Sequence, residues 1–551
     1  MRNWILPLSV AVGLPAILSL AVVGCNGDDD GTVGESNCVD EVDNDNDGVT
    51  DCDDPDCAST LACDNDTDTD DTDTDTDDTD TGDILKTLGD AAAVVTGEDN
   101  DDWAGFSMGG GGDINGDGNQ DIIIGAPKHD CKDAGGNTLV DSGAAYVVFG
   151  PVSGNISLSD ADITICGGRA DAQLGYTVAL APDVTGDGND DIVVSAPRES
   201  AGRAFIFSGL TASPDPLIAD LRAEPSVITI DLQGEGTEFR FGQALFVAAA
   251  DRRSPTTVWV GSDAYSGRDA GTSNLGRTYS FPSPLDPAEE QYRASRSSTT
   301  FTGANEKEDS GGSIVVGDFD GDGENDMVIG ATRAPNGATL NTGAAYVQYG
   351  DFSDRRWTLD QVDVTFSGSA ENQGFGHKVA NAGDLNDDGV DDLAVGALTA
   401  GNENGAVYVW FGKRDEWVSG DAQTVDVVFE GERAFDRAGH GVDGVRDMTG
   451  DGIADLAIGA IGSDLESVSE RGVVYLISGA DNHTGAIGLE DAAYQTFAGV
   501  LRNEQAGHRI LGLGDVTGDG NNDFLVGAYR SGAAGDDTGA VYVMAGPILG
   551  N

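Results

Sequence analysis

A nine-residue segment rich in Asp and Gly recurs six times along the chain, at a spacing of about 67 residues. In the first copy, oxygen-bearing side chains occupy positions one, three, five and nine. Gly118 allows a turn at position six, and the backbone carbonyl of Asn119 is available at position seven. Hard oxygen ligands in a flexible loop suit six- to eight-coordinate Ca²⁺. One such segment could be an ordinary Asp/Gly turn, but six copies in register predict calcium loops.

The predicted ligands occupy the same loop positions in every copy, and the residue at position seven acts through its carbonyl. They are Asp113, Asn115, Asp117, Asn119, Asp121, Asp183, Thr185, Asp187, Asn189, Asp191, Asp318, Asp320, Asp322, Glu324, Asp326, Asp384, Asn386, Asp388, Val390, Asp392, Asp447, Thr449, Asp451, Ile453, Asp455, Asp515, Thr517, Asp519, Asn521 and Asp523.

The six loops are not equal in charge. Loop 318–326 has a carboxylate at all four of these side-chain positions, whereas the loops that begin at Asp183, Asp447 and Asp515 have Thr at position three. Additional anionic ligands usually tighten calcium binding. We therefore expect loop 318–326 to retain its metal longest under chelation.

A seventh repeat lacks the loop. Residues 251–257 contain one carboxylate, two arginines, and Pro255 in place of a turn glycine. One acid beside two arginines is a poor site for a hard dication. We predict that this repeat is metal-free, that Arg252 or Arg253 supplies the positive charge, and that the repeats bind six Ca²⁺ ions.

The segments around each loop predict four strands per repeat. An apolar run such as Ile122–Ala126 follows the loop, and a Tyr-containing run such as Ala144–Phe149 comes next. A third run ends at Phe366-Ser-Gly368 or its equivalents, and the following one begins at a pair such as Phe375-Gly376. Four short strands in a repeat of this length are typical of a β-propeller blade.

The chain resembles the FG-GAP repeats that form the β-propeller head of integrin α subunits. The resemblance rests on the Phe-Gly pairs, on Gly125-Ala-Pro127 and its variants, and on the acidic loop between them. It covers roughly residues 84–551 and, counting the degenerate repeat around Phe241-Gly242, implies seven blades. The expected fold is all-β, a seven-bladed propeller of four-stranded antiparallel blades.

The two ends of this region predict how the ring closes. The last repeat stops at its third strand, Val541–Met544, whereas Ala92–Gly97 precedes Trp103 as a fourth strand precedes the next blade. The N-terminal strand should therefore complete blade seven and remove an exposed sheet edge.

The first residues resemble a bacterial lipoprotein leader. A basic start and an apolar stretch, residues 1–24, end at Val22-Val23-Gly24-Cys25, where Cys25 would be the lipidated residue. The alternative is an uncleaved transmembrane anchor, which Pro7 and Pro15 disfavour. We expect lipid anchoring in the bacterial envelope, at the outer membrane or cell surface.

Residues 25–83 predict a stalk: a tether (25–37), a small Cys/Asp-rich calcium module (38–63) and an Asp/Thr linker (64–83). The module would hold one further Ca²⁺ within residues 43–54; an acidic disordered spacer is the alternative. Apart from Cys25, six of the seven cysteines remain, an even number consistent with disulfides. The pairing of Cys38, Cys52, Cys57 and Cys63 stays open, while Cys131 and Cys166 should meet on one face of the first blade.

The formal net charge of −68 disfavours nucleic acid and anionic lipid as partners, and we expect a monomer that contacts the membrane through its lipid alone. His377, His440 and His508 share one repeat position, which indicates packing, and His129 and His483 stand apart from any nucleophile or base. We expect no enzyme, although paired carboxylates of a glycosidase type remain an alternative.

The function predicted from these features is recognition of a protein or glycan. The alternatives are a secreted enzyme acting on polysaccharide or lipid, and a structural envelope protein. The long loops after the second strands, at residues 128–142, 263–276, 332–342 and 462–471, lie opposite the calcium loops and should form the ligand face. Changes at Tyr265 or Arg268 should weaken binding, and changes at Trp357, between strands three and four, should not.

Overall fold

The computed structural model describes residues 85–548, apart from residues 134, 210–216, 221–228, 236–239, 267–273, 288–290, 351, 353–354, 415–416 and 465–469. The leader, Cys25, the Cys/Asp-rich module and the Asp/Thr linker all lie outside the described residues. Among those described, no helix is long and apolar enough to cross a membrane.

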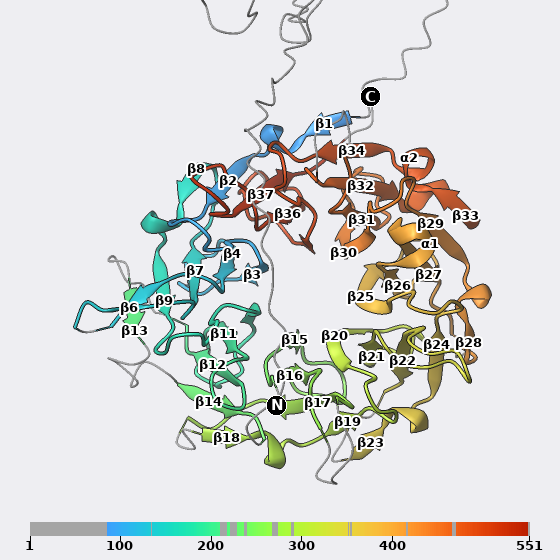
Figure 1. Cartoon of the computed structure of the whole chain (residues 1–551), viewed down its shortest axis with the longest axis horizontal. Helices are drawn as coiled ribbons and strands as arrows, with labels where there is room; N and C mark the ends of the chain where they lie inside the picture. Colours follow the sequence, from blue (N-terminus) through green and yellow to red (C-terminus); the bar gives the residue numbers. More distant parts are fainter. Residues whose placement is uncertain are drawn as a thin grey trace, which may run out of the picture. The chain divides into compact units, whose positions relative to one another are not determined.

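Seven sheets surround a common centre (Figure 1), which confirms the seven-bladed all-β propeller. The inner strands are β3 (Ser107–Gly112), β10 (Val178–Ala181), β15 (Ala244–Ala248), β20 (Ser310–Gly317), β25 (Phe375–Gly383), β30 (Ala438–Arg446) and β35 (Arg509–Gly512). We number the blades one to seven in this order.

The second strand of each blade is buried along its whole length, as its continuous apolar sequence predicts. These strands are β4 (Asp121–Ala126), β11 (Asp191–Ala196), β16 (Thr257–Ser262), β21 (Asp326–Ala331), β26 (Asp392–Ala397), β31 (Asp455–Ala460) and β36 (Asp523–Ala528).

Two further antiparallel strands follow in each blade. The third strands are β7 (Ala144–Val148), β12 (Arg203–Phe207), β17 (Arg277–Pro282), β22 (Ala344–Gln348), β27 (Ala406–Trp410), β32 (Val473–Ser478) and β37 (Ala540–Ala545). The fourth strands are β9 (Ile163–Cys166), β14 (Ile230–Gln233), β19 (Thr300–Thr302), β24 (Val364–Ser367), β29 (Val427–Glu430), β34 (Gln495–Ala498) and, in blade seven, β2 (Ala93–Thr96).

Each sheet has five strands instead of the expected four. The fifth strand pairs in parallel with the fourth strand. It comes from the connection between strands three and four of the next blade, except in blade six, where it is the N-terminal strand that precedes β2. From blade one to blade seven these strands are β13 (Leu217–Asp220), β18 (Gln291–Arg293), β23 (Arg356–Thr358), β28 (Gly420–Asp421), β33 (Gly485–Gly488), β1 (Leu85–Thr87) and β8 (Gly154–Ser157). The remaining elements are the hairpin of β5 (Cys131–Lys132) and β6 (Thr138–Leu139), the helical turns α1 (Ala400–Glu403) and α2 (Leu489–Ala492), and short 3-10 turns.

The ring closes as predicted from the sequence. Strand β2 pairs antiparallel with β37, in a register that joins Ala93 to Val543 and Thr96 to Ala540. The buried side chains form seven apolar clusters, and each cluster combines residues of two neighbouring blades, including blades seven and one. The blades are therefore held together by packing around the whole ring.

The motif glycines are required where blades touch. A Cβ atom on Gly125, in β4, would lie 2.0 Å from the carbonyl oxygen of Gly175 in blade two, and Gly175 itself has φ +79°. Neither position accepts a larger residue without backbone movement. The Gly-Ala-Pro and Phe-Gly motifs thus mark the contact between adjacent blades.

Candidate metal centres and the opposite face of the ring

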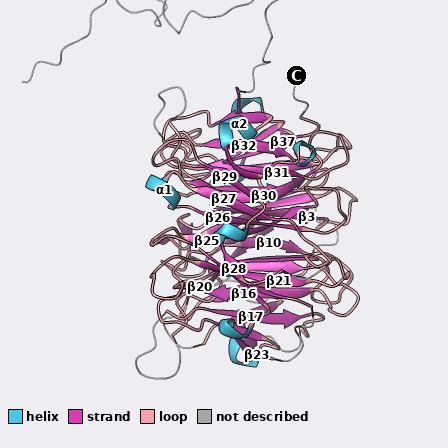
Figure 2. Ribbon diagram, turned by 90° about the vertical axis from the view of Figure 1, so that its right-hand side faces the viewer, coloured by secondary structure: helices cyan, strands magenta, loops and turns pink. Residues whose placement is uncertain are grey.

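The six acidic loops occupy one face of the propeller. Each loop joins an inner strand to the second strand of the same blade, as residues 113–120 join β3 to β4. Figure 2 views the ring edge-on, and its strands run from one face to the other, with loops gathered at both ends. The loops after the second strands, which include α1, therefore emerge on the opposite face.

The first residue of the loop organises the turn. In blade one, the carboxylate of Asp113 accepts hydrogen bonds from the backbone N–H groups of Gly116, Asp117 and Gly118 at 2.8 to 3.0 Å. Asp515 makes the corresponding three bonds in blade seven. These bonds hold the loop in a tight turn.

The carboxylate at position nine connects the loop to the sheet. In all six loops its Oδ2 accepts the backbone N–H of position two at 2.7 to 2.8 Å. In four blades its Oδ1 accepts an N–H from the end of the third strand, such as Gly150. Position nine therefore has a structural role in addition to the ligand role predicted for it.

Burial raises the pKa of these position-nine carboxyl groups, because backbone hydrogen bonds compensate only part of the lost hydration. The pKa rises to about 8 at Asp326 and Asp392, to about 7 at Asp455, and to about 6 at Asp121 and Asp191. A nearby cation would stabilise the charged form of each group.

The loops fit a hard dication by two observations. In the described part of the chain, Oδ1 of Asp183, Asp318 and Asp523 is buried without a hydrogen-bond partner. In blade four, one oxygen each from Asp318, Asp320 and Asp326 lies within 4.8 Å of the other two. Ionised carboxylate oxygens at such separations repel one another unless a cation lies among them.

A residue that the sequence prediction passed over joins neighbouring loops. Position eight is polar in five of the six loops, and its side chain contacts the preceding blade: Oδ2 of Asp190 accepts the N–H of Asp113, and Oδ2 of Asp391 accepts that of Asp318. Asn522 donates to the carbonyl of Asp447 in the same way. The recurrence of polar residues at position eight could have indicated this contact between loops from the sequence alone.

Blade three differs, and its two arginines contact the next blade. Nη1 of Arg252 donates to the carbonyl oxygen of Asp322 at 3.3 Å, and Nε of Arg253 lies 2.5 Å from Oε1 of Glu324. Asp251 accepts the N–H of Asn325, a position-eight residue. The arginines thus place their positive charge on the loop of blade four, not within blade three.

The structure corrects two expectations about which side chains could contact a ligand. Tyr265 is only 3% exposed, and the guanidinium of Arg277 lies 3.7 Å from its ring centroid, so it packs inside blade three and cannot serve as a ligand contact. Trp357 belongs to strand β23, where its ring stacks on Phe301 at 6.1 Å, so it is not a neutral control position. Arg268 lies outside the described residues.

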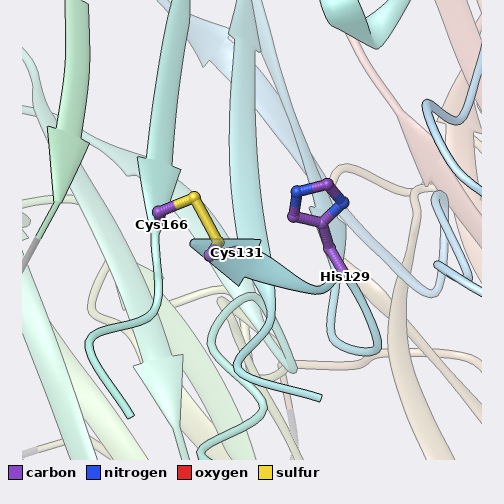
Figure 3. A group of neighbouring side chains, drawn as sticks. All are labelled: His129, Cys131 and Cys166. Atoms are coloured by element: carbon purple, nitrogen blue, oxygen red, sulfur yellow. A yellow bond between two sulfur atoms is a disulfide. The ribbon is translucent and has the colours of Figure 1, made fainter. Parts of the chain in front are cut away.

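The disulfide prediction is confirmed. Cys131, on β5, is bonded to Cys166, at the end of β9, with 5.9 Å between the Cα atoms (Figure 3). His129 lies beside this bridge, and the expectation that it has no base nearby was wrong. Its Nδ1 is 2.9 Å from Oδ2 of Asp102, and both side chains are buried. Burial alone would lower the pKa of His129, but the Asp102 hydrogen bond and charge raise it.

The three repeat-position histidines contact one another at the centre of the ring. The ring centroids of His377 and His440 are 4.9 Å apart, and those of His440 and His508 are 4.5 Å apart. Burial lowers the pKa of His377 to about 4 and that of His440 to about 3, so both are neutral at pH 7. Neither histidine is arranged with a nucleophile in the described structure.

These features define a β-propeller with cation-type loops on one face, and comparison with known proteins is consistent with that class. The FG-GAP repeat model matches residues 104–148, 174–207, 310–347, 375–410 and 509–544, which fall in blades one, two, four, five and seven. The chain belongs to the FG-GAP family of integrin α-type propellers.

Its relatives include two kinds of protein. The chain is 30% identical over 338 residues to phosphatidylinositol-glycan-specific phospholipase D of Homo sapiens, covering 55% of this chain and 36% of that protein. It is 30% identical over 246 residues to integrin alpha-5 of Xenopus laevis, covering 42% of this chain and 20% of that protein. With integrin alpha-PS5 of Drosophila melanogaster it shares 34% over 158 residues, 28% of this chain and 15% of that protein. The chain thus spans less than half the length of these relatives.

Proposed function

We propose that this protein is a recognition propeller, stabilised by six Ca²⁺ ions and attached to the bacterial cell surface through lipid on Cys25, that binds a protein or glycan ligand. The integrin α relatives support the recognition role. The single observation that carries the calcium assignment is the convergence of Asp318, Asp320 and Asp326 in a loop whose pattern recurs in five other blades.

Ligand binding is assigned to the face opposite the calcium loops. Of the five large apolar side chains that are exposed among the described residues, four belong to loops on this face: Val140, Leu340, Phe435 and Val500. The fifth, Val418, lies in a connection between strands three and four. Single exposed apolar residues are common, but their accumulation on one face distinguishes it as the interaction surface.

A binding screen with matched variants tests this assignment. The full chain is applied to a glycan array and used for protein capture, with calcium and with chelator. We expect Leu340→Asp and Phe435→Asp to abolish the captured signal and Val418→Asp, an equally exposed apolar position, to preserve it. Loss with Val418→Asp alone would move the binding surface to the calcium-loop side.

The similarity to a phospholipase D supports one alternative, a lipid- or polysaccharide-acting enzyme. The described residues contain no recognised catalytic constellation, and the buried His129–Asp102 pair has no free nucleophile beside it. Incubation of the full chain with phosphatidylinositol-glycan-anchored substrates should give no release above the buffer rate. Release that persists after purification and is lost in His129→Gln would establish the enzyme in place of the binding module. The third alternative, a structural envelope protein, predicts no ligand in either screen.

The lipid anchor has its own test. Metabolic labelling with a fatty-acid analogue should mark the wild-type chain and not Cys25→Ser, and only the wild type should fractionate with membranes. Equal membrane association of both chains would contradict the assignment of Cys25 as the lipidated residue.

A further inference from the structure

The inner strands of all seven blades enclose a channel through the centre of the ring. Its cavity has a volume of about 270 Å³ and is lined by residues of β3, β10, β15, β20, β25, β30 and β35. Figure 1 shows β3, β15, β20, β25 and β30 on the side of their blades nearest the centre. The lining is made mostly of small and apolar side chains, so charged groups within it are conspicuous.

Three charged residues line this cavity: Lys378 of blade five, Asp443 of blade six and Arg509 of blade seven. The channel therefore has an excess of one positive charge, in a chain that has 97 acidic and 29 basic residues. This sign is opposite to that of the protein as a whole.

The two cations have no partner among the described residues. Neither the Lys378 ammonium group nor the Arg509 guanidinium makes a hydrogen bond or an ion pair there, and both side chains are half-buried. Asp443 accepts the N–H of Gly512 at 3.0 Å. An unpaired cation in an enclosed site loses hydration without compensation.

The pKa directions agree with this geometry. Burial, followed by the charge of Arg509, lowers the pKa of Lys378 to about 8, and Asp443 offsets only part of the shift. Burial also lowers the pKa of Arg509, and it raises the pKa of Asp443 to about 6. The remaining charge of the cluster is thus positive at pH 7.

The adjoining ring of side chains offers neutral polar groups. His377 and His508 directly precede Lys378 and Arg509 in the chain. Nδ1 of His508, a residue 7% exposed, has no hydrogen-bond partner among the described residues. Nδ1 of His440 lies 3.1 Å from the carbonyl oxygen of His508. Phe106 and Tyr176 continue the ring, at 5.0 Å between their centroids. A neutral imidazole can donate one N–H to an acceptor in the channel.

We propose that the central channel binds an oxyanion, a carboxylate, sulfate or phosphate group, between Lys378 and Arg509. The group would supply the missing negative charge, and the planar guanidinium of Arg509 can donate two parallel hydrogen bonds to it. This site is separate from the calcium loops. The oxyanion proposal does not depend on which ligand binds the face opposite the calcium loops. Either proposal can therefore fail without affecting the other.

Two small probes test the site in the full chain, at fixed calcium concentration and ionic strength. Sulfate is titrated by calorimetry, and trifluoroacetate is followed by the broadening of its ¹⁹F NMR signal. We expect saturable binding of one ion per chain by at least one probe. The tighter probe identifies the group as tetrahedral or as a carboxylate.

Substitutions of the charged channel residues test whether the ion binds between Lys378 and Arg509. Lys378→Met and Arg509→Met should each weaken the affinity by about tenfold or more, whereas Asp443→Asn, which removes the competing carboxylate and keeps an acceptor for Gly512, should strengthen it. Arg502→Gln removes an exposed cation outside the channel and should change nothing. If a methionine variant does not fold, Asp443→Asn still decides the question. Absence of saturable binding, or equal weakening by Arg502→Gln, would overturn the proposal.

Discussion

At the scale of single residues, the loop carboxylates divide into two kinds. Asp113 and its equivalents shape the turn by accepting several loop N–H groups, whereas Asp121 and its equivalents bond to the sheet. The second kind is buried and its pKa is raised, so its charged form needs a cation more than the exposed ligands do. The same residue type therefore shapes the loop at position one and connects the loop to the strand at position nine, in addition to the ligand role predicted for both.

The first prediction concerns Asp318, the predicted calcium ligand at position one of loop 318–326. Asp318→Asn should lower the calcium content by one ion per chain and abolish the stabilisation from that site, about 2.7 kcal/mol when free calcium is 100-fold above its dissociation constant. Metal analysis and thermal unfolding in calcium measure the two effects. The control, Asp251→Asn, changes the equivalent residue of blade three and should leave the ion count unchanged. A loss of one ion there would mean that blade three binds calcium.

The second prediction concerns the His129–Asp102 pair. Because the folded-state pKa of His129 is raised, the pair contributes stability that is complete below the unfolded pKa of about 6.5 and is lost as pH rises through the folded value. Asp102→Asn should therefore destabilise the protein by roughly 2 kcal/mol at pH 5.5 and by less at pH 8.5. Unfolding of both chains at the two pH values measures this. An equal loss at both would show that the histidine is not charged in the pair.

At the scale of elements, blade three differs from the other six because an arginine-containing segment stands where they have an acidic loop. Its arginines contact Asp322 and Glu324 of blade four, so the positive charge of this loop lies beside the acidic loop of its neighbour. The Arg253–Glu324 pair is half exposed, with the Arg253 side chain 65% accessible, and such pairs contribute little net energy. Packing and backbone hydrogen bonds must hold this blade.

The third prediction restores the missing loop. Replacing residues 251–257 with an Asp-x-Asn-x-Asp-Gly-x-x-Asp segment should add one calcium ion per chain relative to wild type and raise the thermal midpoint in calcium. The difference in ion count is the readout, because it is independent of any ion bound in the N-terminal module. An unchanged count would show that blade three lacks more than the loop sequence.

The fourth prediction concerns the order in which the six loops lose calcium under chelation. Hydrogen-exchange mass spectrometry during chelator titration should show loop 318–326 losing protection last. It has carboxylates at all four side-chain ligand positions, and Asp318, Asp320 and Asp326 converge. Loops with Thr at position three should open first. Simultaneous loss from all six loops would contradict this ranking, and early loss from blade four would mean that the nearby arginines dominate.

The sequence predicts the elements that recur in every repeat. It does not predict the elements and contacts that form only with an adjacent blade. The buried second strands and the loops follow from local pattern, and the closing strand β2 follows from counting. Strand β8 does not, since it is only partly buried and its residues pair with residues of β2 that lie 61 positions earlier in the chain. The Asp190 and Asp102 contacts likewise join residues 77 and 27 positions apart. Such partners become neighbours only after the blades have assembled.

At the scale of the whole molecule, stability is distributed around the ring. Each of the seven apolar clusters is shared by two blades, so no blade has a core of its own. A blade that opens therefore exposes apolar surface on both of its neighbours. Within blade seven, the N-terminal strand β2 pairs with the C-terminal strand β37, and this pairing joins the two ends of the described chain.

The final prediction tests this junction. Val95, 1% exposed in β2, packs in the cluster shared by blades seven and one, so Val95→Asp should bury an unpaired carboxylate and cost several kcal/mol. Displacement of β2 would also leave the N–H and C=O groups of β37 unpaired, and an open edge of this kind favours self-association. Thermal unfolding and light scattering in saturating calcium should therefore show a lower midpoint and higher-order species. Thr87→Asp places the same charge at an exposed position of β1 and should remain a stable monomer. If both variants unfold alike, the ring does not depend on the β2–β37 pairing for its closure.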